Sequence, residues 1–260
     1  MKARYLYAVL AVSLALSVTA CGKKETAEEQ PAKPAAATVS APVDPATAGA
    51  ITGTVKLDGA APKAQRIRMD AEPNCAKMHS TPVMDEEYVV GDKGALANVV
   101  VYVKDGLGNR TFDTPKETVV LDQNGCVYKP HVVAVRVNQP VEIVNSDPTT
   151  HNVHPVPTNN KEWNKSQPPK AEKIVETFAR EEVAIPVKCN VHPWMKSYIA
   201  VFKHPYFKIT GKDGAFEIKN LPPGEYTLVA WHGVLGPSAE QKVTIGAKET
   251  KAIEFSFKAQ

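Results

Sequence analysis

The chain has 260 residues, of which 43% are hydrophobic and 23% charged, a mix typical of globular proteins. This composition excludes collagen-like, coiled-coil and wholly disordered chains. The formal net charge is only +3 and no run of Lys or Arg stands out, so nucleic acid is not an expected partner. Twenty-one prolines and fifteen glycines interrupt short runs rich in Val, Ile, Thr and aromatic residues, which predicts an all-β fold.

The N-terminus has the pattern of a secretory leader. Lys2 and Arg4 precede an apolar stretch at residues 6–20 that is too short to span a bilayer. The following sequence, VTACG, resembles a bacterial lipobox, so we expect a signal peptide at residues 1–20 and lipidation of Cys21. The alternative is an ordinary signal peptide followed by a chance cysteine. Gly22 in place of Asp indicates the outer membrane, with the folded part facing the periplasm of the cell envelope.

A linker is expected next, at residues 21–50. This stretch is rich in Ala, Pro, Glu and Lys and almost without aromatic or β-branched residues, so it lacks the apolar surface needed for a core. Its prolines favour extended backbone, and it would hold the folded part away from the membrane.

The cysteine count predicts one disulfide. Lipidation of Cys21 leaves Cys75, Cys126 and Cys189, an odd number in an oxidising compartment. Cys189 alone lies among metal-ligand residue types, in VKCNVHPWMKSY, which leaves Cys75 and Cys126 to pair. The alternative is a second metal site formed by Cys75 and His79, although that spacing matches neither haem attachment nor structural zinc.

The run Cys189-x2-His192-x2-Met195 contains a thiolate, an imidazole and a thioether, a set of ligands that favours copper. A trigonal copper site with two histidines and one cysteine needs another imidazole from elsewhere in the fold. The segment NSDPTTHNVHPVP offers His151 and His154, and it follows an alternating apolar stretch at residues 141–144 that predicts a strand.

The pair HNVH and CNVHPWM resembles the copper-binding segments of the cupredoxins, and among them the short-loop amicyanins. The stretch YKPHVVAVRVNQPVEIVNSD is similar to strands that precede the first ligand in that family. The resemblance implies a Greek-key β-sandwich at residues 114–204 with one type 1 copper. Its ligands would be His151, Cys189, His192 and, as a weak axial ligand, Met195, with His154 outside the site.

The resemblance also implies roles for two neighbours of the ligands. The backbone N–H of Asn152 would donate to the Cys189 sulfur, a contact that tunes a metal centre. Val191 stands where the amicyanin pattern has proline and therefore has a backbone N–H, which we expect to point at the same sulfur.

The segments on either side of this region resemble a second kind of β-sandwich. Residues 208–258 contain the pattern D-x-x-F-x-I-x-x-L-P-P-G-x-Y within strands and tight turns, which is similar to the carboxypeptidase regulatory-like, transthyretin-like module. Residues 51–113 would supply its early strands and residues 205–260 the remainder, with the cupredoxin inserted between them. The alternative is three modules in a row, in which residues 51–112 extend the cupredoxin.

The sequence favours a binding protein over an enzyme, because it contains no nucleophile elbow, phosphate-binding glycine loop or HExxH motif. The leading hypothesis is one-electron transfer between periplasmic or membrane redox proteins. In this hypothesis His192 lies near the surface, and Pro193 and Trp194 form an apolar docking rim. The alternatives are copper trafficking or buffering with the same ligands, and a structural β-sandwich lipoprotein.

Overall fold

The computed structural model describes residues 43–259, which belong to one compact unit. Their regular secondary structure is almost entirely β-strand, so the all-β prediction is confirmed. The predicted signal peptide and Cys21 lie outside the described residues. Within them, no helix is long and apolar enough to cross a membrane.

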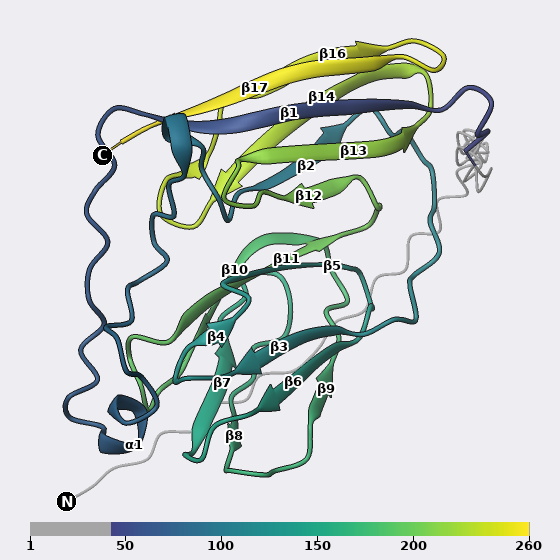
Figure 1. The fold of residues 1–260 in the computed structure, drawn as a ribbon. Helices are drawn as coiled ribbons and strands as arrows, with labels where there is room; N and C mark the ends of the chain where they lie inside the picture. The colour runs from purple at the N-terminus through teal and green to yellow at the C-terminus, as the bar shows by residue number, and fades with distance from the viewer. Residues whose placement is uncertain (1–42, 260) are drawn as a thin grey trace, which may run out of the picture. The chain divides into compact units, whose positions relative to one another are not determined.

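Strands from the two ends of the described chain form one sandwich (Figure 1). One sheet has the order β13-β1-β17, with β1 at Gly49–Asp58, β13 at Ala215–Leu221 and β17 at Thr250–Lys258. The facing sheet contains β2 (Val100–Asp105), β12 (Phe207–Ile209), β14 (Gly224–His232), β15 (Gly236–Pro237) and β16 (Gln241–Ile245). We call this the flanking sandwich. Its β1 pairs in parallel with β17, so strands about 200 residues apart in the chain are neighbours.

The segment between these strands forms a second sandwich, here called the central sandwich. One sheet has the order β5-β11-β10-β7-β8, and the other has the order β4-β3-β6-β9. The first contains β5 (Val132–Arg136), β7 (His151–Pro155), β8 (Lys165–Gln167), β10 (Glu182–Lys188) and β11 (Lys196–Phe202). The second contains β3 (Val119–Gln123), β4 (Tyr128–Lys129), β6 (Val141–Asn145) and β9 (Ile174–Glu176).

The alternating apolar pattern explains why these strands form a sandwich. In β6, Val141 and Ile143 are fully buried, whereas Glu142 between them is only partly buried and pairs with Lys173 at the surface. Successive side chains of a strand point to opposite faces, so one face of β6 contributes to the core. Strand β6 ends at Asn145, and the segment that follows it leads to His151 at the start of β7.

One segment departs from the predicted arrangement. Residues 66–84, here called the capping segment, were expected among the early strands of the flanking module at 51–113. The segment instead has a short helix, α1 (Pro73–Ala76), and its apolar residues Met69 and Cys75 belong to the core of the central sandwich. The backbone pairs the ends of the segment, since the N–H of Ile67 donates to the oxygen of Val83 at 2.9 Å. A short 3-10 helix, η1 (Asp92–Gly94), then leads back to β2.

The predicted linker also ends earlier than residue 50. Strand β1 already begins at Gly49, and Asp44 accepts the backbone N–H groups of Thr47 and Ala48 in a turn before it. Gly49 pairs with Leu221, and Ala50 pairs with Thr250. The strand ladder therefore orders residues whose composition alone indicated a flexible chain.

Candidate metal centre

The first residue of one strand and one loop of the central sandwich carry the predicted ligands. His151 is the first residue of β7, and residues 189–195 connect β10 to β11. Two backbone hydrogen bonds close this connection. The N–H of Met195 donates to the oxygen of His192 at 2.9 Å, and the N–H of Cys189 donates to the oxygen of Met195 at 3.3 Å. The tight loop explains why a spacing of three residues places Cys189 and His192 side by side.

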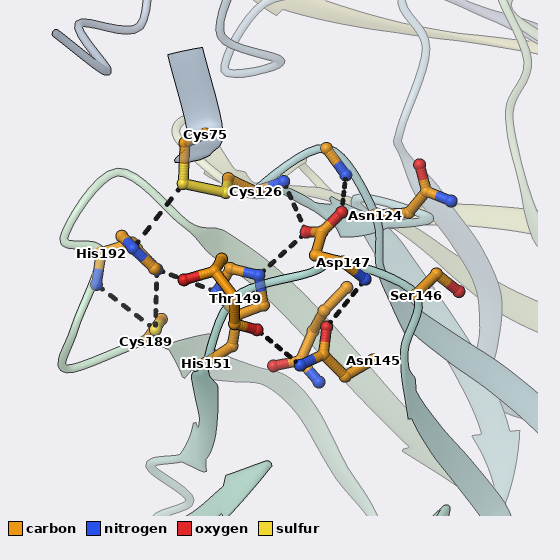
Figure 2. A network of polar contacts seen from close by, with 12 residues as sticks. Cys75, Asn124, Cys126, Asn145, Ser146, Asp147, Thr149, His151, Cys189 and His192 are labelled. Atoms are coloured by element: carbon orange, nitrogen blue, oxygen red, sulfur yellow. Dashed lines mark hydrogen bonds and ion pairs between the residues drawn. A yellow bond between two sulfur atoms is a disulfide. The ribbon is translucent and has the colours of Figure 1, made fainter. Parts of the chain in front are cut away.

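Three predicted ligands converge in the interior (Figure 2). The Nδ1 atoms of His151 and His192 lie 2.8 Å apart, and the Cys189 sulfur lies 3.9 Å from the His192 Nδ1. All three ligand atoms lie within 4.8 Å of one another. The side chains are almost completely buried, with 0%, 3% and 1% of the residue surface exposed for His151, Cys189 and His192.

Two backbone N–H groups point at the Cys189 sulfur. That of Asn152 lies 3.5 Å away, as the resemblance implied, and that of His192 lies 3.3 Å away. The Val191 N–H donates to the side-chain oxygen of Asn152 at 3.3 Å, and it also contributes, least of the three backbone N–H groups, to lowering the pKa of Cys189, as the predicted contact with the sulfur implies. Burial favours the neutral thiol, but the hydrogen bonds from His151 and these backbone groups outweigh it and lower the pKa of Cys189.

Asp147 fixes the orientation of His151. Its carboxylate lies 2.8 Å from the His151 Nε2 and accepts the backbone N–H groups of Gly125 and Cys126 at 2.6 and 2.7 Å. Burial opposes ionisation of Asp147, but these hydrogen bonds, with that from His151 the largest, lower its pKa. Burial likewise opposes protonation of His151, but its hydrogen bonds to Asp147 and Cys189, together with their charges, raise its pKa. The remaining nitrogen, Nδ1, faces His192 and Cys189.

The side chain of Asn152 holds the ligand loop. Its oxygen accepts the N–H of Asn190 at 2.6 Å as well as that of Val191. Its backbone oxygen in turn accepts the hydroxyl of buried Tyr128 at 2.6 Å, and burial raises the pKa of that hydroxyl. Asp147, Tyr128 and the side-chain amide of Asn152 were not predicted to belong to the site, although the backbone N–H of Asn152 was. The only available signal was the position of Asp147 four residues before His151.

The other two predicted assignments concern Met195 and His154. Met195 is completely buried in the same apolar core as Cys189. His154 is only half-buried, and its two ring nitrogens contact Asn190 at 3.1 Å and Glu162 at 2.7 Å. His154 is not part of the cluster that His151, Cys189 and His192 form.

His192 does not lie at the surface as predicted, because the capping segment covers it. Cys75 and Cys126 form a disulfide, and the Cys75 sulfur lies 3.7 Å from the His192 Nε2. Glu72 reaches to 4.0 Å from the same nitrogen. On another side the ring of Trp194 lies 5.1 Å from the His192 ring, and its N–H donates to the backbone oxygen of Cys126. The sequence distance of 117 residues between Cys75 and His192 explains why no local pattern revealed this contact.

The family comparison concerns the C-terminal half of the chain. A family model described as polysaccharide lyase family 4, domain II, matches residues 182–253, which is less than a third of the chain. It differs from the carboxypeptidase regulatory-like module expected at residues 205–260, so that resemblance is not supported. No curated protein matches the chain.

Solved structures similar to this chain include copper proteins. A copper-containing nitrite reductase from Thermus scotoductus SA-01 is 21% identical over 34% of this chain, with a TM-score of 0.32. The match spans only 23% of that reductase. A purple cupredoxin from Nitrosopumilus maritimus is 20% identical over 32% of this chain and 98% of its own, with a TM-score of 0.28. A reduced amicyanin variant is 24% identical over 34% of this chain and 86% of its own, with a TM-score of 0.29. The likeness concerns one part of the chain.

The donor set itself fits copper. Two imidazoles and one thiolate meet in an interior from which water is largely excluded, and such a set suits copper better than magnesium or calcium, which prefer oxygen ligands. Two of the three donors are oriented by hydrogen bonds, His151 by Asp147 and the Cys189 sulfur by two backbone N–H groups. These residues therefore form a candidate metal-ligand group.

Proposed function

We propose that His151, Cys189 and His192 hold one copper ion as a type 1 centre, with Met195 as the axial ligand, and that the protein transfers single electrons. The observation that carries this proposal is the convergence of two Nδ1 atoms and one thiol sulfur within 4.8 Å in the interior. A trigonal His2Cys set with a weak axial Met is the pattern of blue-copper electron-transfer sites.

Copper bound there would supply a one-electron couple, and the protein's part is to keep the donors in place in both oxidation states. Asp147 holds the His151 ring through Nε2, which leaves Nδ1 as the free donor. The N–H groups of Asn152 and His192 withdraw electron density from the Cys189 sulfur. Since these groups are themselves buried and hydrogen-bonded, little rearrangement is expected when the charge at the site changes.

Trp194 is the group through which we expect electrons to reach His192. Its ring lies 5.1 Å from the imidazole, and together with the exposed Pro193 it lines a groove of about 490 Å³ on the surface. The proposed docking rim therefore remains at residues 193–194, although His192 itself lies beneath the cap. The partner would be another redox protein, and the proposal includes no enzymatic reaction.

Copper trafficking or buffering is the second candidate. The observation that favours it is the cover over His192, whose 1% exposure differs from the surface position expected of an electron exit. In either case we propose a lipid-anchored protein facing the periplasm, on the basis of the lipobox-like sequence at Cys21.

The visible spectrum of the Cu(II)-loaded protein tests the proposal. We expect one copper per chain and an intense blue absorption, because charge transfer from the thiolate to Cu(II) needs a direct bond to Cys189. The band should be absent in Cys189→Ser. A colourless Cu(II) form of the unmutated protein would refute the type 1 assignment and support copper buffering.

His151 and His154 provide a matched pair for the ligand assignment. His151→Ala should open the site to added imidazole and change the spectrum, because it removes a buried donor. His154→Ala should leave the spectrum nearly unchanged, since its ring contacts Asn190 and Glu162 outside the cluster. The opposite pattern would show that the ligand register is wrong.

A further inference from the structure

The disulfide above His192 forms a second cluster of metal-ligating atoms. The sulfurs of Cys75 and Cys126 and a ring nitrogen of His192 lie within 4.8 Å of one another, and all three residues are buried. This cluster meets the His192 ring at Nε2, 3.7 Å from the Cys75 sulfur, whereas the inner cluster meets it at Nδ1. The two clusters thus lie on opposite nitrogens of one imidazole (Figure 2).

The two cysteines are held differently. Cys126 is fixed to the central sandwich, because its N–H donates to Asp147 and its oxygen accepts the N–H of Trp194. Cys75 lies on the four-residue helix α1 of the capping segment, which is joined to the same region by a contact of 2.8 Å between the His79 Nε2 and the oxygen of Gly125. With the disulfide broken, Cys126 and the His79 contact would therefore still hold the two sulfurs near His192.

We propose that reduction of the Cys75–Cys126 disulfide creates an outer Cu(I) site formed by two thiolates and the Nε2 of His192. Soft sulfur ligands select Cu(I), and an imidazole completes a three-coordinate set. The ion held there would contact the same ring that the inner cluster uses, so the outer site is placed to exchange copper with the inner cluster across His192. The intact disulfide offers no thiolates, so the oxidised protein lacks the outer site.

The reduction balances with a dithiol as the reductant. A thiolate of the dithiol attacks one sulfur of the disulfide, and its second thiol then resolves the mixed disulfide. Two electrons pass to the protein, Cys75 and Cys126 become thiols, and the two sulfurs of the reductant join. Cu(I) then displaces the two thiol protons to solvent.

The experiment uses the full chain with Cys189→Ser, so that the thiolate of the inner site is absent. This protein is reduced with a dithiol, freed of excess reductant without oxygen, and given one equivalent of Cu(I) from a chelator. X-ray absorption should then show two sulfur neighbours and one nitrogen neighbour. The same protein with its disulfide intact should show no thiolate sulfur at copper, and Cys75→Ser/Cys126→Ser should lose both sulfurs.

His192 and His151 provide the matched control, because both belong to the inner cluster but only His192 faces the disulfide. In the Cys189→Ser background, His192→Ala should remove the nitrogen neighbour, and His151→Ala should keep it. Circular dichroism checks that each variant is folded. Coordination by sulfur alone, or loss of the nitrogen in His151→Ala, would overturn the proposal. Because Cys189 is absent throughout, these results are independent of whether the inner centre is a type 1 copper site.

Discussion

The two β-sandwiches of this chain differ in the hydrogen-bond partners of their buried histidines. His232, in β14 of the flanking sandwich, is 2% exposed, and its Nδ1 accepts the N–H groups of Val234 and Leu235 in its own turn. His151, at the start of β7 in the central sandwich, contacts Asp147 and His192 from separate segments. Both rings are satisfied, but only the second shares an interior point with other donor atoms.

This difference shows that burial alone does not make a histidine a candidate metal ligand. A buried imidazole bonded to its own turn contributes to packing, as His232 does beside Tyr88 and Phe257. A metal site needs several donors aimed at one point, each oriented by a further hydrogen bond. In the central sandwich Asp147 orients His151 and Asn152 donates to the Cys189 sulfur.

The largest effect is expected from the apolar core of the flanking sandwich. Phe255 is 1% exposed in that core, so Phe255→Ala should lower the free energy of unfolding by about 3–5 kcal/mol. Urea denaturation of the metal-free protein measures this loss. The blue band of the copper-loaded variant, recorded where it is still folded, should be unchanged. A lost band would show that the flanking core shapes the metal site.

Low pH should destabilise the protein through His204 and His232, two buried histidines that lie outside the metal-ligand clusters. Burial lowers the pKa of His204 and of His232 to about 4 in the folded chain, from 6.5. Between these two values the unfolded chain binds protons that the folded chain does not, so stability falls as the pH falls from about 6.5 to about 4. The loss should approach about 3 kcal/mol for each histidine.

Urea denaturation of the metal-free protein at pH 7 and pH 4.5 measures this effect. His232→Gln should reduce the difference in unfolding free energy between the two pH values, because one titrating group is removed. An unchanged difference would mean that His232 is protonated equally in the folded and unfolded chains.

Asp147→Asn tests the contact that orients His151 in the central sandwich. The amide keeps the shape of the carboxylate but loses the charge that orients His151. We expect copper affinity to fall by about 10- to 100-fold, as is typical when the partner of a ligating histidine is changed. Competition with a copper chelator measures the affinity. Equal affinity in both proteins would show that Gly125 and Cys126, and not His151, are the partners that matter for Asp147.

The smallest effect is expected from Val191→Pro. The Val191 N–H donates mainly to the Asn152 side chain and contributes least of the three backbone N–H groups that lower the pKa of Cys189, so its removal should lower the reduction potential only slightly. Val191 is 49% exposed, which leaves room for the proline ring. Voltammetry with the visible spectrum checks both points. A large decrease in potential would show that this N–H is a main donor to the Cys189 sulfur.

The sequence by itself determined the features that depend on local order. Alternating apolar residues and turn residues gave the all-β class, and the types and spacing of His151, Cys189 and His192 indicated a copper site, because one short loop and one strand end present them. The odd number of cysteines indicated the pair Cys75 and Cys126, which the structure joins.

Only the tertiary structure decided what surrounds these donors. Asp147 reaches Gly125 and Cys126 across more than 20 residues, and Cys75 reaches His192 across 117. The target of the Val191 N–H depended on the rotamer of Asn152, a residue 39 positions away. Such contacts depend on how the strands pair and on how the capping segment packs on the central sandwich. Neither residue type nor periodicity in one stretch of chain predicts them, so the cover over His192 follows only from the folded chain, in which the capping segment between β1 and β2 packs on the central sandwich.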